Sequence, residues 1–273
     1  MMREAKPIQM VVSDLDGTLL DESRFISDDA VRLIDHLKKQ NIGFTFITGR
    51  PYTAVKKFET RANITLPIVT CNGAEIIHGG NSIFQKSMPL EPLRNIMLTA
   101  MQMDSTVLFY HNGVEYALSE TPWVRERQHR GTPYPLPDLT KSFWATQEAE
   151  KVTIINDSLN AEFSSKLPVS RIAEDYTVCC YGNSGCEITS KGMNKGEGLK
   201  KLSAILGVCL DNILAIGDSE NDIELFQTAG VSAAVSNATD TAKQHADFIC
   251  SRPRTNGVIE AITHFCLIQR DTK

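Results

Sequence analysis

Short apolar runs alternate with helical segments at both ends of this chain, and the alternation restricts the kind of sheet that the chain can form. Near the N-terminus, apolar runs at 8–12, 42–47 and 68–71 have the length of buried strands. Ser27 provides an N-cap for a helix that is predicted to extend to about Gln40. The last third repeats the rhythm with helices predicted at about 195–206, 221–229 and after 238, and strands at 212–216, 231–235 and 248–250. This rhythm predicts an α/β fold, a Rossmann-like parallel-sheet core with helices on both faces.

The middle of the chain has a different pattern, in which hairpin signals replace the strand–helix rhythm. Apolar pairs flank residues 78–81, and apolar runs flank Asn112-Gly113, which is a strong signal for a tight hairpin turn. Hairpins join antiparallel strands, which an all-parallel sheet does not contain. We therefore expect an inserted α+β cap domain at residues 81–190, and a catalytic core formed by residues 1–80 and 191–273.

Four polar segments lie where predicted strands end or predicted helices begin. They are Asp14-Leu15-Asp16-Gly17-Thr18, Thr48-Gly49-Arg50, Lys195-Gly196 and Gly217-Asp218-Ser219-Glu220-Asn221-Asp222. Taken singly, each also fits a structural role as a turn, a helix capping box or a solvated surface. Lys195 fits such a role least well, because a cation in the first turn of a helix opposes the macrodipole unless an anion binds there. Ligands bind beyond the carboxyl ends of strands in open parallel sheets, so the four segments together predict a site for Mg²⁺ and phosphate.

The same segments carry a family resemblance that covers nearly the whole chain. In chain order they resemble the four motifs of the haloacid dehalogenase superfamily, and Asn72-Gly73-Ala74 resembles the family's exit into its cap. The chain is similar to the Cof-type phosphatases of subfamily IIB, which carry a large C2 cap after the second motif. The resemblance implies a Mg²⁺-dependent phosphohydrolase that acts on small phosphorylated metabolites through an aspartyl-phosphate intermediate.

The resemblance also implies roles for the polar residues of these motifs. Asp14 is expected to attack phosphorus, while Asp16 protonates the leaving group and then deprotonates the attacking water. Lys195 is expected to balance charge between Asp14 and the phosphate. The implied substrate-binding residues are Thr48, Gly49, Lys195 and Asn221. The implied metal residues are Asp14, Asp16 through its backbone carbonyl, Asp218, and Asp222 through metal-bound water.

The resemblance leaves the substrate open among sugar phosphates, pyridoxal phosphate, nucleotides and flavin mononucleotide. The predicted cap is expected to act as a lid that excludes water and reads the leaving group. Its candidate reading residues are Tyr110, His111, Trp123 and Tyr181. For each of these four, ordinary packing is the more frequent role.

Two alternatives to hydrolysis also use such a site. A phosphotransferase or phosphomutase keeps the fold and passes the aspartyl-phosphate to a second hydroxyl, so it releases no free phosphate without an acceptor. A phospho-accepting signalling or binding module also uses Asp, Thr, Lys and Mg²⁺ on an α/β sheet. Such a module needs neither Asp16 nor a large inserted domain, and its phosphorylated form is long-lived.

Composition narrows the partners and the location that we expect. The net charge of -5 disfavours a nucleic-acid partner, so the expected partner is a small phosphate ester, with the oligomeric state open. No apolar stretch is long enough to span a membrane, and the N-terminus lacks a signal-peptide pattern. The seven cysteines form no C-x-x-C pair, which predicts free buried thiols in a reducing compartment. We therefore expect a cytoplasmic protein.

Overall fold

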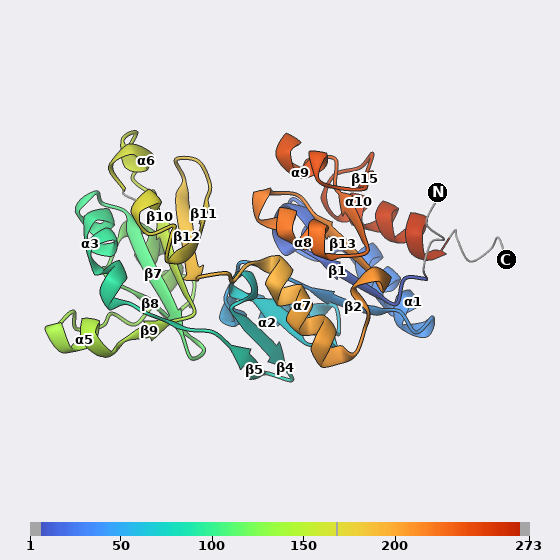
Figure 1. Cartoon of the computed structure of the whole chain (residues 1–273), viewed down its shortest axis with the longest axis horizontal. Coiled ribbons are helices and arrows are strands. Elements are labelled where there is room, and N and C mark those ends of the chain that lie inside the picture. The colour runs from blue at the N-terminus through green and yellow to red at the C-terminus, as the bar shows by residue number, and fades with distance from the viewer. Residues whose placement is uncertain (1–6, 168, 268–273) are drawn as a thin grey trace. The chain divides into compact units, whose positions relative to one another are not determined.

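Two compact units make up the chain in a computed structural model that describes residues 7–167 and 169–267 (Figure 1). The first unit takes its residues from both ends of the chain, up to residue 84 and from residue 194 onward. The second unit comprises residues 85–193 together with 51–53. The predicted lack of a signal peptide concerns the start of the chain, of which residues 1–6 lie outside the described range.

A parallel sheet of order β15-β14-β13-β1-β2 forms the centre of the first unit. Its strands are β1 (Met10–Ser13), β2 (Gly43–Phe46), β13 (Ile213–Gly217), β14 (Val231–Ala234) and β15 (Phe248–Ile249). Every residue of β1 and β13 is buried, which explains why both strands are continuous apolar runs and not alternating ones. Ser13, the last residue of β1, pairs with Ile216 of β13 and with Phe46 of β2. The segments that follow these three strands therefore emerge together at one edge of the sheet.

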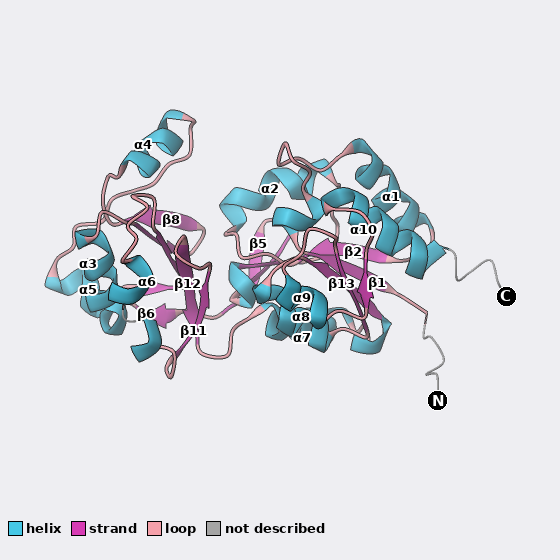
Figure 2. Ribbon diagram, turned by 90° about the horizontal axis from the view of Figure 1, so that it is seen from above, coloured by secondary structure: helices cyan, strands magenta, loops and turns pink. Residues whose placement is uncertain are grey.

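Helices cover both faces of this sheet, which confirms the predicted fold. Figure 2 shows α1 (Asp28–Lys39) and α10 (Arg254–Ile262) on one face, and α7 (Lys195–Leu206), α8 (Ile223–Thr228) and α9 (Asp240–Gln244) on the other. The Ser27 hydroxyl accepts the Ala30 N–H at the start of α1, as its N-cap position predicts. The unit also contains α2 (Tyr52–Arg61) from residue 54 onward. No helix in the described ranges is both long and apolar enough to cross a bilayer.

A small antiparallel sheet of β3 (Ile68–Thr70), β4 (Glu75–His78) and β5 (Asn81–Gln85) completes the first unit. An isolated parallel bridge between Ile47 and Val69 connects it to the end of β2. The turn from β3 to β4 has left-handed backbone at Cys71, Asn72 and Gly73. A Cβ atom on Gly73 would lie 2.3 Å from the carbonyl oxygen of Asn194, so only glycine permits this turn to approach the start of α7 so closely.

The second unit is an antiparallel sheet of order β11-β12-β10-β7-β8 with helices packed against it. Its strands are β7 (Thr106–His111), β8 (Val114–Ala117), β10 (Lys151–Ile155), β11 (Tyr176–Cys180) and β12 (Gly185–Ser190), and a two-stranded ribbon joins β6 (Met88–Pro89) to β9 (Glu148–Ala149). The helices are α3 (Arg94–Gln102), α4 (Pro122–His129), α5 (Lys141–Thr146) and α6 (Phe163–Lys166). Asn112 and Gly113 both have positive φ, as the predicted tight hairpin between β7 and β8 requires.

All seven cysteines are free thiols, but the prediction that they are buried is only partly right. Four of them are buried: Cys71, Cys186, Cys250 and Cys266. Cys180 and Cys209 are exposed and Cys179 is intermediate. The exposure of Cys179 and Cys180 was not predicted because the apolar residues around them suggest a buried strand. That strand, β11, lies at the edge of its sheet.

Candidate active site

A buried lysine joins two buried carboxylates at the carboxyl edge of the parallel sheet. Asp14 directly follows β1, and its backbone N–H donates to the carbonyl of Ile216 over 2.8 Å. The Lys195 ammonium lies 2.7 Å from Oδ1 of Asp14 and 2.7 Å from Oδ1 of Asp222. Lys195 is 1% exposed and Asp14 4% exposed, so these charges balance one another almost without water.

The start of α7 positions the lysine. The side chain of Asn194 caps this helix by accepting the Glu197 N–H over 2.9 Å. A Cβ atom on Gly196 would lie 2.5 Å from the carbonyl oxygen of Glu224, so the glycine lets α7 pack closely on α8. This close packing brings Lys195 and Asp222 within contact distance, and the penalty of a cation in a first helical turn is offset by carboxylates from other elements.

Burial and mutual repulsion disfavour the ionised forms of the carboxylates. Burial raises the pKa of Asp14 well above its usual range, and the charges of Asp222 and Asp218 raise it further, against the lowering effect of Lys195. Burial, together with Asp222, raises the pKa of Asp218 to about 6. Burial alone would lower the pKa of Lys195, but the two carboxylates that it contacts raise it overall. The site therefore holds more negative charge than its lysine neutralises.

The carboxylates of Asp14, Asp218 and Asp222 each offer an oxygen within 4.8 Å of the others, a spacing that a divalent cation can bridge. Asp218 approaches the Asp14 loop closely, since Thr18 donates to its Oδ1 over 2.6 Å and a Cβ on Gly17 would lie 2.2 Å from its Oδ2. In Asp222, Oδ1 contacts Lys195 and Oδ2 accepts the N–H groups of Asp218 and Ser219. Asp14 and Asp218 consequently have the freer oxygens, and hard oxygen donors of this kind suit Mg²⁺.

The carboxylate of Asp16 is not part of this cluster. The side chain is exposed and forms a two-pronged ion pair with Arg50, whose Nε lies 2.5 Å from Oδ2. Arg50 belongs to the segment after β2, where the buried Thr48 hydroxyl accepts the Arg50 N–H and Gly49 is partly exposed. The sequence assigned no role to Arg50, and its pairing with a residue 34 positions away has no signature in the sequence.

Asn221 is held in place by two side chains. Its Oδ1 accepts the Ser219 hydroxyl over 2.7 Å, and its Nδ2 donates to Oδ1 of Asn72 over 3.4 Å. Asn72 is buried in the strained turn after β3, and its own N–H donates to the carbonyl of Thr48. The sequence suggested for Asn72 only an exit into the cap, whereas here it links the Thr48 segment to Asn221.

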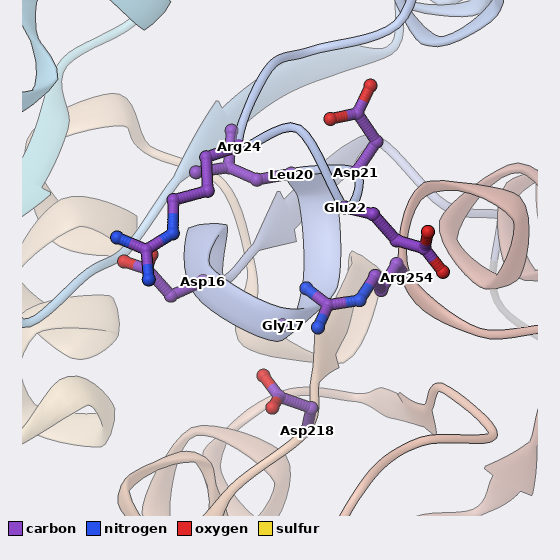
Figure 3. A pocket seen from close by; sticks show the side chains of 8 residues that line it. All are labelled: Asp16, Gly17, Leu20, Asp21, Glu22, Arg24, Asp218 and Arg254. Atoms are coloured by element: carbon purple, nitrogen blue, oxygen red, sulfur yellow. The ribbon is translucent and has the colours of Figure 1, made fainter.

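An open pocket of about 410 Å³ lies beside Asp16 and Asp218 (Figure 3). It is lined by Asp16, Gly17, Leu20, Asp21, Glu22, Arg24, Asp218 and Arg254. Arg24 and Arg254 both have positive φ, and Figure 3 shows their side chains at this pocket. Sequence reasoning found neither arginine, because both lie outside the four polar segments.

The structure also locates the four candidate reading residues of the second unit. Tyr110 is 1% exposed, and His111 Nδ1 lies 3.1 Å from Oε1 of Glu150. The Arg127 guanidinium stacks 3.3 Å from the centre of a Trp123 ring, and the exposed Tyr181 donates to Glu187 over 2.8 Å. These contacts lie within the second unit, so they assign no substrate role to any of the four.

The raised pKa of Asp218 predicts a pH effect on the metal-free protein. Between the ordinary value of 3.8 and about 6, the folded state binds more protons at Asp218 than the unfolded state does. The free energy of unfolding should therefore rise as the pH falls through this window. In EDTA, lowering the pH from about 7 to about 5 should stabilise the wild type by about 1 kcal/mol relative to Asp218→Asn.

Urea unfolding of both proteins at both pH values measures this difference. Saturating Mg²⁺ should abolish the gain, because the cation keeps the carboxylate ionised. A wild-type-minus-variant difference that does not change with pH in EDTA would contradict the assigned cause.

The chain is similar to known hydrolases and phosphatases over nearly its whole length. Residues 11–262 match the family described as haloacid dehalogenase-like hydrolase. The chain is 28% identical to 5-amino-6-(5-phospho-D-ribitylamino)uracil phosphatase YitU of Bacillus subtilis, over 96% of this chain and 98% of that protein. It is 26% identical to the Bacillus subtilis phosphatase YcsE, described as acting on the same compound, over 97% and 98% of the two chains. A haloacid dehalogenase-like hydrolase from B. subtilis has a similar fold, with a TM-score of 0.81, 19% identity and coverage of 96% and 100%.

Proposed function

The chain belongs to the haloacid dehalogenase-like hydrolases, and from this premise we propose that it is a Mg²⁺-dependent phosphohydrolase that uses Asp14 as a covalent nucleophile. The resemblance inferred from the motifs is confirmed by the family match, and the expected class of enzyme, a phosphatase, is confirmed with it. The metal, the aspartyl-phosphate intermediate and the residue roles below belong to the proposal.

One observation carries the proposal: a buried carboxylate, Asp14, lies at the end of a central strand and is held by a buried lysine. A carboxylate fixed in this way would present its second oxygen to an incoming phosphorus atom with little loss of side-chain entropy on binding. Lys195 also contacts Asp222, so it remains neutralised when the charge on Asp14 moves to the phosphoryl group.

The neighbouring residues support the two proton transfers and the binding of phosphate. Thr48 and Gly49 follow β2 at the same edge of the sheet and offer a hydroxyl and an N–H group for phosphoryl oxygens. Asp16 pairs with Arg50, and its carboxylate would accept a proton from the attacking water. We propose that Asp16 leaves Arg50 and takes up a proton for the first step, in which it protonates the leaving oxygen.

The donor set fits Mg²⁺. Asp14 and Asp218 would hold the ion with the Asp16 carbonyl. Asp222 accepts the Asp218 N–H, which orients the Asp218 backbone, and it would also orient metal-bound water. When bound, the ion would neutralise the excess negative charge of the carboxylates and of the phosphoryl group. Burial raises the pKa of both Asp14 and Asp218, and this supports the assignment, because a bound cation would stabilise the ionised forms that burial disfavours.

Phosphate release from a panel of phosphate esters tests the proposal. The first compound is 5-amino-6-(5-phospho-D-ribitylamino)uracil, because two relatives across nearly the whole chain are described as phosphatases for it. The panel continues with sugar phosphates, pyridoxal phosphate, nucleotides and flavin mononucleotide. We expect free phosphate without any added acceptor, and a loss of at least about 10²-fold in EDTA that Mg²⁺ reverses.

The control is addition of Mg²⁺ in excess of the chelator, which separates metal loss from irreversible damage. Release that EDTA leaves unchanged would overturn the metal assignment. A requirement for an added acceptor would replace hydrolysis with phosphoryl transfer.

A further inference from the structure

Two cysteines face each other across the last hairpin of the second unit. In the antiparallel pair of β11 and β12, Cys180 lies directly opposite Cys186. Directly opposed residues place their side chains on the same face of a sheet. Cys180 is exposed at the end of its strand, whereas Cys186 is 2% exposed and belongs to the apolar core of the unit.

The hydrogen bonds of the hairpin identify the kind of pair that the two cysteines form. The Tyr181 N–H donates to the carbonyl of Gly185 over 2.9 Å, so Tyr181 and Gly185 form a hydrogen-bonded pair. Hydrogen-bonded and non-hydrogen-bonded pairs alternate along an antiparallel ladder, which makes Cys180 and Cys186 a non-hydrogen-bonded pair. Such pairs have Cα atoms about 4.5 Å apart, within the range of about 4.4–6.8 Å that a disulfide spans.

We propose that Cys180 and Cys186 form a reversible disulfide by exchange with a small-molecule disulfide such as glutathione disulfide. Cys180 is the attacking residue, because its exposure lets a reagent reach the sulfur. Cys186 is the resolving residue, because it is buried against the protein core and contacts no solvent-borne reagent.

The exchange proceeds in two balanced steps. The Cys180 thiolate attacks one sulfur of the reagent, the reagent's S–S bond breaks, and one glutathione thiolate leaves with a mixed disulfide remaining on Cys180. The Cys186 thiol then loses its proton and attacks the Cys180 sulfur, which releases the second glutathione. Two protein thiols are oxidised to one disulfide, and one glutathione disulfide is reduced to two glutathione thiols.

The surroundings favour Cys180 over the other accessible thiols. Its hydrogen bond with Cys186 lowers the pKa of Cys180 to about 7, against the opposing effect of burial, so much of it is thiolate at neutral pH. Cys179 is next in sequence, but successive strand residues point to opposite faces. On that other face Cys179 contacts Tyr181 and lies opposite Glu187, so it has no thiol across the ladder.

Treatment of the full-length protein with glutathione disulfide, followed by alkylation of the remaining thiols in denaturant, tests the pairing. Trypsin leaves all three cysteines of the hairpin in one fragment, because no Lys or Arg lies between Arg171 and Lys191. Chymotryptic cleavage after Tyr181 separates Cys180 from Cys186. We expect two peptides joined by a bond and lighter than their sum by two hydrogen atoms, and dithiothreitol should separate them.

Three matched Cys→Ser variants assign the roles. Cys186→Ser should accumulate glutathione on Cys180, Cys180→Ser should form neither the adduct nor the crosslink, and Cys209→Ser, at another exposed cysteine, should crosslink like the wild type. Alkylation of both Cys180 and Cys186 after treatment would overturn the proposal. So would a crosslink that joins Cys179 in place of Cys180 and persists in Cys180→Ser.

Discussion

Asp14→Asn is expected to lower phosphate release by at least about 10⁴-fold at saturating Mg²⁺, because an amide oxygen cannot displace the leaving group and no other described carboxylate shares its position at the end of β1. The variant should remain folded. Burial disfavours the ionised form of Asp14, so a neutral side chain of nearly the same shape relieves desolvation, and Lys195 keeps its contact with Asp222.

Two measurements separate this prediction from a loss of structure. Rapid acid quench of the wild type during turnover should show one phosphoryl group on the peptide that contains Asp14, and the variant should show none. Asp29→Asn, a matched change at an exposed residue of the first turn of α1, should retain wild-type turnover. Turnover of Asp14→Asn close to that of wild type would remove Asp14 from the nucleophile position.

The strand ends could be predicted from the sequence because burial leaves a local record. Every residue of β1 is buried, so the strand is an unbroken apolar run and the first carboxylate after it, Asp14, marks its carboxyl end. Lys195 could also be identified as a candidate site residue from the sequence, because a lysine in the first turn of a helix is unfavourable next to the positive end of the macrodipole. Local features of this kind identified Asp14 and Lys195 as candidate site residues. In the structure, Lys195 contacts both Asp14 and Asp222.

Contacts between loops that are distant in the sequence have no comparable pattern in the sequence. The ion pair of Asp16 with Arg50 and the link from Asn72 to Asn221 depend on how whole segments are placed, and no periodicity encodes that placement. The helix α10 was missed for a different reason: Asn256-Gly257 is a turn signal inside it. A Cβ atom on Gly257 would lie 2.4 Å from the carbonyl oxygen of Arg252, so close packing requires a glycine at this position. The same glycine produces the turn signal that argues against a helix in the sequence.

Lys195→Met is expected to lower the free energy of unfolding by about 3–5 kcal/mol in EDTA. The change leaves the carboxylates of Asp14 and Asp222 buried without the ammonium that lies 2.7 Å from each. Urea unfolding at neutral pH measures the loss. Lys200→Met, in the same helix but in an exposed pair with Glu197, should change stability by less than about 1 kcal/mol.

The cause can be isolated by removing the charge that Lys195→Met leaves behind. Adding Asp14→Asn to Lys195→Met should restore part of the lost stability, because one buried carboxylate then no longer lacks a counter-charge. Saturating Mg²⁺ should also restore part of it in the single variant and less in the double variant, which lacks one of the two freer metal carboxylates. If Lys195→Met unfolds at the same urea concentration as Lys200→Met, Lys195 does not balance the buried charges. Solvent must then neutralise or hydrate the carboxylates of Asp14 and Asp222 in the folded state.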